Sequence, residues 1–500
     1  MTTLQLQEPK GAAANAPSAP PSRLREWAPL VVLMIGTFMI VLDFFIVNVA
    51  LPSIQTGLHA SATAIEWVVA GYGLTFAVFL IASGRIGDRV GRRRTFAWGL
   101  AAFVVSSALC GLAPNEGVLV GARFAQGVGG ALMSPNILSM LGVVYPGERR
   151  VRAITAYGLV MGLAAASGQL IGGLLIAANI AGGGWRTIFL INVPIGLAAL
   201  ALTPRLLPES RAEKAKRVDL LGMALVTGAL VALVLPLVQG RNDGWPVWTW
   251  VSFGVSALLL ATLAVTQRRL HARGGSPLLD PVLFKNRNLR SGLTTQLAFW
   301  CGQAAFFLVL ALYLQQGRGL SPLKAGLVFS ILAAAYLAVS MRAPSLTMRF
   351  GRDLVFVGAL LIAAGDIALW LFVHHYGSGG PLGLLAPGLV LTGAGMGLAI
   401  TPLTTTVLAH ATPETAGSIS GALSTMQQVG NALGVAITGA VFYGALDHGV
   451  ATAFERSLVE LTILLCAVAA LSRLLPGRRT TAAAAPATPP AAPQTTEKAA

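Results

Sequence analysis

The chain has 500 residues, of which 55% are apolar and only 11% are charged, and its mean hydropathy is +0.72. About a quarter of the residues in a soluble domain are charged, so this composition excludes a soluble globular protein and indicates an all-α integral membrane protein. The net charge of +16 does not indicate nucleic-acid binding, because the basic residues lie in short segments between long apolar runs. The three cysteines, Cys110, Cys301 and Cys466, lie inside apolar runs. We therefore predict no disulfide framework, no metal site and no cofactor.

Fourteen apolar segments follow one another along the chain, each about as long as the roughly twenty residues needed to span the hydrocarbon core. Their approximate limits are 29–50, 66–84, 95–113, 117–141, 153–177, 187–206, 219–238, 247–266, 292–314, 324–341, 354–373, 383–408, 417–444 and 457–475. The ends of the chain, residues 1–26 and 476–500, are rich in Ala, Pro and Thr and lack apolar periodicity. We expect both to be disordered cytosolic tails.

A weak internal repeat divides the chain into two parts. Arg349, Gly351 and Arg352, which follow the tenth predicted span, repeat the spacing of part of an earlier basic loop at 84–94. Parallel halves with related sequences are a transporter architecture. We therefore expect an N-terminal six-helix half at 27–206, two inserted transmembrane helices at 207–270, and a C-terminal six-helix half at 271–475.

The distribution of basic residues predicts the orientation. Of the 35 lysines and arginines, 29 fall in the tails and in alternate loops on one side of the predicted layout, five fall on the other side, and Arg123 lies within a span. Positive residues are retained on the cytosolic side of the membrane. This split predicts that both termini are cytosolic and that the protein resides in the plasma membrane.

The basic loop after the second predicted span contains five arginines and one aspartate. Its pattern Gly-x-x-x-Asp-Arg-x-Gly-Arg-Arg resembles the signature loop of the major facilitator superfamily. The residues that carry the pattern are Gly84, Asp88, Arg89, Gly91 and Arg92. The resemblance implies a gating loop at the cytosolic ends of the helices, and a simple positive anchor is the alternative.

Three further motifs, at 42–52, 119–129 and 185–196, resemble the fourteen-span drug:proton antiporter branch of that superfamily. Its fifth-span antiporter motif is represented by Gly168, Gln169, Gly172 and Gly173, with Gln169 in the place of the usual proline. The resemblance covers about residues 29–475. It implies the major facilitator fold and the export of lipophilic, cationic drugs or antibiotics in exchange for protons, by alternating access.

Two opposite charges within spans, Asp43 and Arg123, are the leading candidates for the chemistry. An ionisable residue inside a membrane marks a functional site by default. From the helical rise, Asp43 lies about 10 Å and Arg123 about 9 Å below the outer boundary. The family's fourth-span arginine is implicated in proton transfer, so we expect Asp43 and Arg123 to couple transport to protons. A static ion pair is the alternative.

Other polar residues within spans are candidates for the wall of a substrate cavity. Asp366 is expected to face the cavity and to attract cationic substrates, or else to turn towards a local polar neighbour. The remaining candidates are Asn48, Tyr72, Gln126, Gln427 and Gln428. Hydrogen bonding between helices is the alternative for each of these.

Two functions fit the sequence: a proton-coupled exporter of several drugs, and a proton-coupled transporter of one natural product or metabolite. An enzyme is disfavoured, because no Gly-x-Ser-x-Gly, no metal-ligand spacing of His and Cys and no phosphate-binding loop occurs in the sequence. We expect small-molecule substrates, protons and the lipid bilayer as partners, no nucleic acid, and a monomer.

Overall fold

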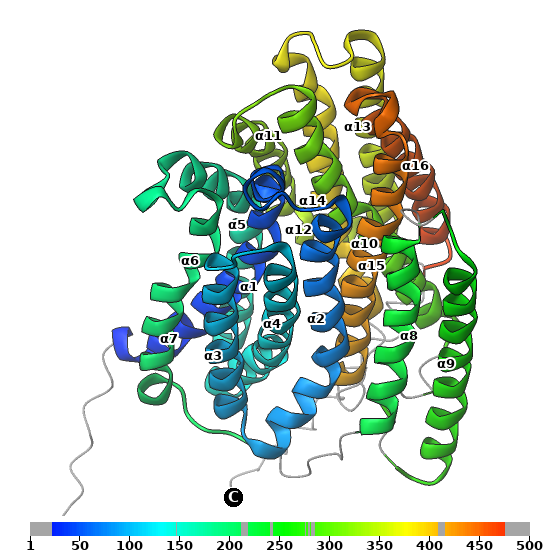
Figure 1. Cartoon of the computed structure of the whole chain (residues 1–500). Helices are drawn as coiled ribbons and strands as arrows, with labels where there is room; N and C mark the ends of the chain where they lie inside the picture. The colour runs from blue at the N-terminus through cyan, green and yellow to red at the C-terminus, as the bar shows by residue number, and fades with distance from the viewer. Residues whose placement is uncertain are drawn as a thin grey trace, which may run out of the picture.

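The computed structural model of the chain describes residues 23–146, 148–211, 219–240, 244–275, 277–278, 281, 286–408 and 416–475. In these ranges the chain forms helices and no strand (Figure 1). The longer helices are α1 (Arg23–Leu58), α2 (Ala62–Val90), α3 (Arg92–Gly111), α4 (Glu116–Val144), α5 (Glu148–Ala178), α7 (Asn192–Leu206), α8 (Leu220–Gln239), α9 (Val247–Ala272), α10 (Arg287–Leu312), α11 (Pro322–Ser340), α13 (Asp353–Tyr376), α14 (Ala386–Leu408), α15 (Ala416–Gly444) and α16 (Val450–Ser472). The shorter ones are α6 (Thr187–Leu190), the π-helical turn η4 (Tyr313–Gly317) and α12 (Ala343–Phe350).

Each predicted span overlaps a helix, and the all-helical fold class is confirmed. Eleven helices within the described ranges are long and apolar enough to cross a membrane, or twelve if the two segments of α5, bent by 45°, count as one span. The helices α15 and α16 do not meet this test. Fourteen spans, and the division at residues 206 and 271 into two halves with an insertion, therefore stay predictions.

The ordered part of the N-terminus begins earlier than predicted. Residues 23–26 form the first turn of α1 instead of belonging to a disordered tail. Glu26 forms an ion pair with Arg149 of α5, and the ring of Trp27 stacks on Tyr145 with centroids 5.1 Å apart. These contacts hold the start of α1 against the ends of α4 and α5. The rest of both predicted tails, 1–22 and 476–500, lies outside the described residues.

Two segments predicted as loops are almost entirely helical. Only Gly91 separates α2 from α3, and its φ of 128° is a conformation that other residues rarely adopt. The repeat of this loop forms α12, whose first turn contains a proline, a residue well suited to a helix N-terminus. The basic residues are therefore held on rigid helix ends.

The helices pack in a pattern that leaves α8 and α9 at the side of the bundle (Figure 1). The helices α1 to α7 pack mainly on one another, and so do α10 to α16. Contacts between these two groups run chiefly through α5 with α11 and α2 with α15, while α8 touches α2 and α15. A space between the two groups is therefore bounded by α5–α11 on one side and α2–α15 on the other.

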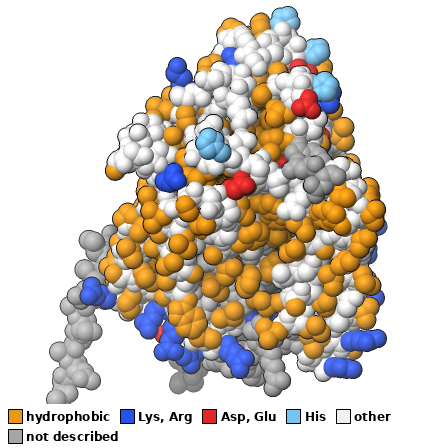
Figure 2. Space-filling view, in the orientation of Figure 1, with side chains coloured by type: hydrophobic (Ala, Val, Ile, Leu, Met, Phe, Trp, Pro, Cys, Tyr) orange, Lys and Arg blue, Asp and Glu red, His pale blue; other side chains and the backbone are white. Residues whose placement is uncertain are grey.

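The surface has an apolar band with charged residues at its ends. Figure 2 shows hydrophobic side chains covering the middle of the molecule and most Lys and Arg side chains gathered at its lower rim. We call this rim the basic end. The junction of α2 and α3, which carries Arg89, Arg92, Arg93 and Arg94, lies there (Figure 1). The outer face of α9 exposes Trp250 and Leu258 by 64% and 66%. Such a band is suited to contact with lipid acyl chains.

Candidate functional site

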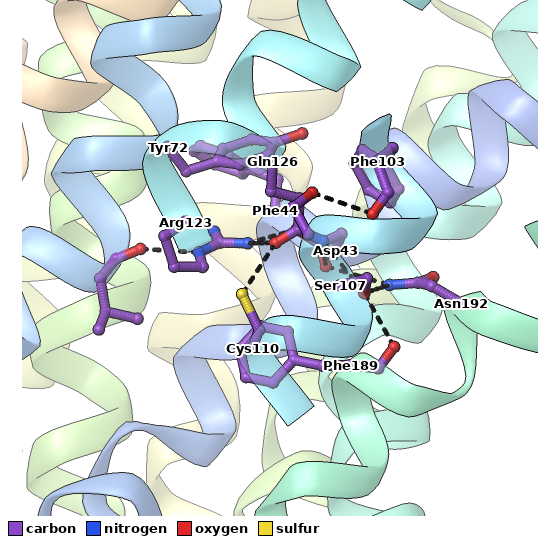
Figure 3. Close-up of polar contacts among 12 residues, drawn as sticks. Asp43, Phe44, Tyr72, Phe103, Ser107, Cys110, Arg123, Gln126, Phe189 and Asn192 are labelled. Atoms are coloured by element: carbon purple, nitrogen blue, oxygen red, sulfur yellow. Dashed lines mark hydrogen bonds and ion pairs between the residues drawn. The ribbon is translucent and has the colours of Figure 1, made fainter. Parts of the chain in front are cut away.

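A buried ion pair joins α1 to α4. Arg123 Nη1 lies 2.5 Å from Asp43 Oδ2, and neither side chain has any exposed surface. The two charges that the sequence places at one depth are therefore in direct contact (Figure 3). Breaking a buried pair by removing one partner typically costs about 3–5 kcal/mol, because the remaining charge is left without compensation.

Amides from two helices complete the coordination of Asp43. Gln126 Nε2 and Asn192 Nδ2 donate to Asp43 Oδ1 over 2.8 and 3.2 Å. Both amides also donate to the hydroxyl of Ser107 on α3, which in turn donates to the carbonyl of Phe189. Asp43 therefore belongs to a buried polar network built from α1, α3, α4, α6 and α7 (Figure 3).

The arginine is held by neutral groups as well. Its Nε donates to the carbonyl oxygen of Val68 over 2.9 Å, and Nη1 also donates to Gln126 Oε1 over 2.8 Å. The ring of Tyr72 lies 4.3 Å from the guanidinium carbon, a geometry suited to a cation–π contact. Nη2 has no hydrogen-bond partner among the described residues. The Nη2 group of Arg123 is thus available to form a hydrogen bond if the contact with Asp43 changes.

A cavity of about 510 Å³ lies beside this network. Its size is that of a pocket for a drug-sized molecule. Helices α1, α2, α4, α5, α10, α11, α14 and α15 supply its walls. Tyr72 and Phe44 belong to both regions, since they line the cavity and surround Arg123 and Asp43 (Figure 3). Asp43 and Arg123 do not line the cavity. The ion pair is therefore screened from it by the ring of Tyr72.

The cavity lies at mid-depth between the two groups of helices and extends towards the basic end. Its residues on α1, 37–45, come from the middle of that helix. Those on α15 come from the first part of the helix after residue 423, and those on α14, such as Thr404, come from the last part. On α5 it includes Gly158, beside which a Cβ would have open space.

At the opposite end the walls meet. Gln315 Nε2 on η4 donates to the carbonyl of Val49 over 2.8 Å, and Gln316 donates to Gln55 over 2.9 Å. Backbone atoms of α11 approach Gly173 of α5 so closely that a Cβ there would lie 2.6 Å from the Pro322 carbonyl oxygen. In this conformation the helices are therefore closed at the end opposite the arginines.

The predicted cavity residues fall into two groups. Tyr72, Gln427 and Gln428 line the cavity, as does Gln169 of the fifth-span motif. Gln126 instead belongs to the network around Asp43. Asn48 lies within α1, where its Nδ2 donates to the carbonyls of Phe44 and Phe45, and it does not line the cavity.

Asp366 is placed differently from the prediction. Its side chain is 1% exposed on α13 and does not line the cavity. Neither carboxylate oxygen has a hydrogen-bond partner among the described residues. Its neighbours along the same stripe of α13, Ile362 and Leu369, are buried in the apolar core. Asp366 is therefore not among the described residues that contact the cavity space.

The fifth-span motif marks a bend although it has no proline. The segments 152–165 and 167–178 of α5 meet at 45°. Ser167 Oγ donates to the carbonyl of Leu163 four residues earlier, a contact that often bends helices, and Gly168 follows it. After the bend, Gly172 packs on α1, where a Cβ would lie 2.6 Å from Val49 Cγ1. The motif thus positions α5 against α1 and α11.

The basic loop is held by an acid that the sequence reasoning missed. Asp88 pairs with Arg92 one turn later, at 2.8 Å. Glu209, just beyond α7, accepts from the backbone N–H of Arg93 over 3.1 Å and lies within 3.7 Å of the Arg93 and Arg94 side chains. A Cβ at Gly91 would lie 2.5 Å from this carboxylate. Asp88 therefore joins α2 to α3, whereas Glu209 ties the loop to the segment that follows α7.

Comparison with known proteins places this arrangement in context. The family model of the Major Facilitator Superfamily matches residues 33–435. A probable actinorhodin transporter of Streptomyces coelicolor is 37% identical over 444 residues, 88% of this chain and 75% of that protein. Multidrug resistance protein Stp of Mycobacterium tuberculosis is 33% identical over 433 residues, 86% of this chain and 78% of that protein.

Solved structures show the same fold. A bacterial homologue of the human lysosomal transporter Spinster, in an inward-facing and occupied conformation, superposes with a TM-score of 0.63. The superposition covers 91% of this chain and 97% of the other at 16% sequence identity. At this identity the likeness concerns the fold alone.

Proposed function

The chain belongs to the Major Facilitator Superfamily, and on that premise we propose that it is a proton-coupled antiporter that exports lipophilic drugs or antibiotics. Its relatives are drug and antibiotic export proteins, which supports efflux transport and a transporter rather than an enzyme. The observation that carries the proposal is the cavity of about 510 Å³, which lies between the two groups of helices and is closed at one end. Small molecules enter it from the basic end.

The proposed cycle is alternating access across the plasma membrane, with the basic end and both termini in the cytosol. The cavity loads from the cytosolic side in the conformation described here. Separation of α5 from α11 and of α2 from α15 at the other end then releases the substrate outside. The positive residues at the basic end support this orientation.

Proton coupling is assigned to Asp43 together with Arg123. Their pair is buried directly behind the cavity wall, because the ring of Tyr72, which lines the cavity, lies 4.3 Å from the Arg123 guanidinium carbon. A proton that reaches Asp43 removes its charge and separates the pair, and Arg123 then reorganises around Gln126 and Tyr72. Because this network includes five helices, the change is transmitted to the packing of α1 against α4 and α7.

Export is tested in cells that accumulate a panel of fluorescent aromatic compounds. Expression of the protein is expected to lower the accumulation of at least one compound, and a protonophore is expected to restore it, since the proposed driving force is the proton gradient. Lowered accumulation that persists in the protonophore contradicts proton coupling. Export of several unrelated compounds supports the multidrug proposal, whereas export of one scaffold alone supports the alternative, a transporter of a single natural product.

The basic loop is expected to control turnover through Glu209. Glu209→Gln removes the negative charge that pairs with Arg93 and Arg94. All three side chains are partly exposed, so the free energy of unfolding falls by no more than about 1 kcal/mol. If the same energy is lost from the conformation that the loop stabilises during turnover, we expect the export rate to fall about fivefold with substrate binding unchanged. Asp88→Asn removes only a pair within the loop and is expected to slow turnover less. The initial export rate and binding to the purified protein are measured side by side. An equal loss of both quantities contradicts a gating role.

A further inference from the structure

The described residues that line the cavity carry no formal charge. None of the described residues that line it is an Asp, Glu, Lys, Arg or His. Its polar groups are hydroxyls and carboxamides, and the rest are aromatic and aliphatic side chains. The sequence predicted a cationic substrate and a carboxylate, Asp366, in the wall, and the structure places this carboxylate elsewhere. The chemistry of the wall therefore bears directly on the charge of the substrate.

The nearest buried charges do not supply a counter-ion. Asp43 is neutralised by Arg123 and lies behind the ring of Tyr72. A cation in the cavity would lose hydration and gain contacts with aromatic faces, hydroxyls and carboxamides, none of which carries a compensating negative charge. The cost of removing a charge from water exceeds what such contacts return. The cavity therefore favours uncharged molecules.

The aromatic side chains form a continuous row across the cavity. Phe45 of α1 packs edge-on against Phe307 of α10 with centroids 5.2 Å apart, and Phe307 stacks on Phe329 of α11 at 5.7 Å. Phe45 also packs edge-on against Phe44 with centroids 5.2 Å apart, and Phe44 lies 6.2 Å from Tyr72. All of these residues line the cavity. Such a row offers faces and edges to a planar ring system over more than one ring.

Two amides on different helices present acceptors. Gln169 Nε2 of α5 donates to the carbonyl of Phe45 over 3.0 Å, and Asn431 Nδ2 of α15 donates to Gln428 Oε1 over 2.9 Å. These bonds leave the carbonyl oxygen of each amide as the free group. Neither Gln169 Oε1 nor Asn431 Oδ1 has a partner among the described residues, and both oxygens are buried although their residues line the cavity. A buried acceptor without a partner gains a hydrogen bond if its amide turns towards a ligand that donates one.

We propose that the cavity binds uncharged, planar, multi-ring aromatic molecules that carry hydroxyl groups. The rings pack on the row from Tyr72 to Phe329, and the amides of Gln169 and Asn431 turn on binding so that their oxygens accept from the hydroxyls. This inference rests on the proposed export function. Because such a substrate carries no charge, its exchange for protons moves net charge across the membrane.

The test is direct binding to the purified full-length protein in lipid nanodiscs. The probes are 1,8-dihydroxyanthraquinone and the same ring system with a quaternary ammonium side chain. We expect the uncharged probe to bind at least tenfold more tightly. Asn431→Asp places a carboxylate in the wall at almost unchanged shape, and it is expected to remove or invert this preference.

A matched control makes the same change of charge outside the cavity. Asn179 lies in the exposed turn after α5, where its Oδ1 accepts from the N–H of Gly184 over 2.9 Å, so Asn179→Asp keeps this bond. It is expected to leave the preference unchanged. Where Asn431→Asp does not fold, Gln427→Glu, also in the wall and partly exposed, replaces it.

Equal or tighter binding of the cationic probe by the natural protein overturns the inference, and so does an unchanged preference in both cavity variants. Binding requires no proton gradient, which separates this test from that of the proposed function. Preference for the uncharged probe without export from cells refutes the exporter and leaves the inference standing. Export from cells with preference for the cation refutes the inference alone.

Discussion

Asp43→Asn is expected to abolish proton-driven export of every substrate. Asparagine keeps the shape of the side chain and can still accept from Gln126 and Asn192, but it neither carries the charge that holds Arg123 nor exchanges a proton. The measurement is proton release on substrate addition, together with uptake into inside-out vesicles driven by a pH gradient. Both signals are expected to vanish, while substrate binding in the cavity persists, because Asp43 does not line it.

Loss of folding is the main competing explanation, since an unpaired Arg123 costs about 3–5 kcal/mol. The double variant Asp43→Asn with Arg123→Gln removes both charges and is expected to recover thermal stability without recovering coupling. Asp353→Asn is the matched control, because this acid pairs with Arg473 at the exposed end of α13. We expect proton-coupled export by this variant to equal that of the unchanged protein. Recovery of proton-coupled export in the double variant would show that the pair is only a structural bridge.

The contact between Asp43 and Arg123 illustrates what the sequence can predict. The helical rise and the alternation of spans place both residues at one depth, and an apolar environment favours the pairing of opposite charges. Gln126 stands one turn after Arg123 and so shares its face of α4, but the sequence does not distinguish this network from the cavity. The sequence does not predict the hydrogen bond from Asn192 to Asp43, because this bond depends on how α7 packs on α1 and α3.

The rotation of each helix about its axis is what the sequence leaves open. The helical rise predicts about the same depth for Asp366 as for Asp43, yet the side chain of Asp366 lies among the apolar core residues of α13 and does not line the cavity. Almost every face of these spans is apolar, so periodicity does not show which side is buried in protein and which contacts lipid. Neighbouring helices decide the rotation. For the same reason Glu209, far from the loop in sequence, was not identified as its partner.

In the fifth-span motif Gln169 replaces the usual proline, so the sequence does not predict whether the helix bends there. The structure has a bend of 45° there without a proline, next to Gly168 and the hydrogen bond from Ser167 to the Leu163 carbonyl. Gln169 belongs to the cavity wall. Beyond the bend, the closest approach of α5 to α11 depends on two glycines. A Cβ at Gly173 would lie 2.6 Å from the Pro322 carbonyl oxygen, and one at Gly326 would lie 2.7 Å from the Gln169 carbonyl oxygen.

Gly173→Ala is therefore expected to force α5 and α11 apart at the end opposite the arginines and to favour a conformation open there. The obstructing atoms belong to the backbone of α11, which cannot move away cheaply, and overpacking of this kind costs about 1–3 kcal/mol. A shift of 1.4 kcal/mol changes the ratio of the two conformations about tenfold. The reporter is Thr404→Cys in the cavity wall, labelled in inside-out vesicles with a membrane-impermeant maleimide. Labelling is expected to slow about tenfold, and export to be lost.

The same helix provides the matched control. A Cβ at Gly158, on the cavity side of the bend, meets nothing within 4 Å, so Gly158→Ala obstructs only a conformation in which the basic end is closed. It is expected to leave labelling of Thr404→Cys as fast as before or faster, although it also slows export. The two alanines thus oppose the cycle at different steps. Should Gly173→Ala reduce thermal stability severely, Gly326→Ala tests the same contact from α11. Unchanged labelling in both variants, with export intact, means that this contact does not open during transport.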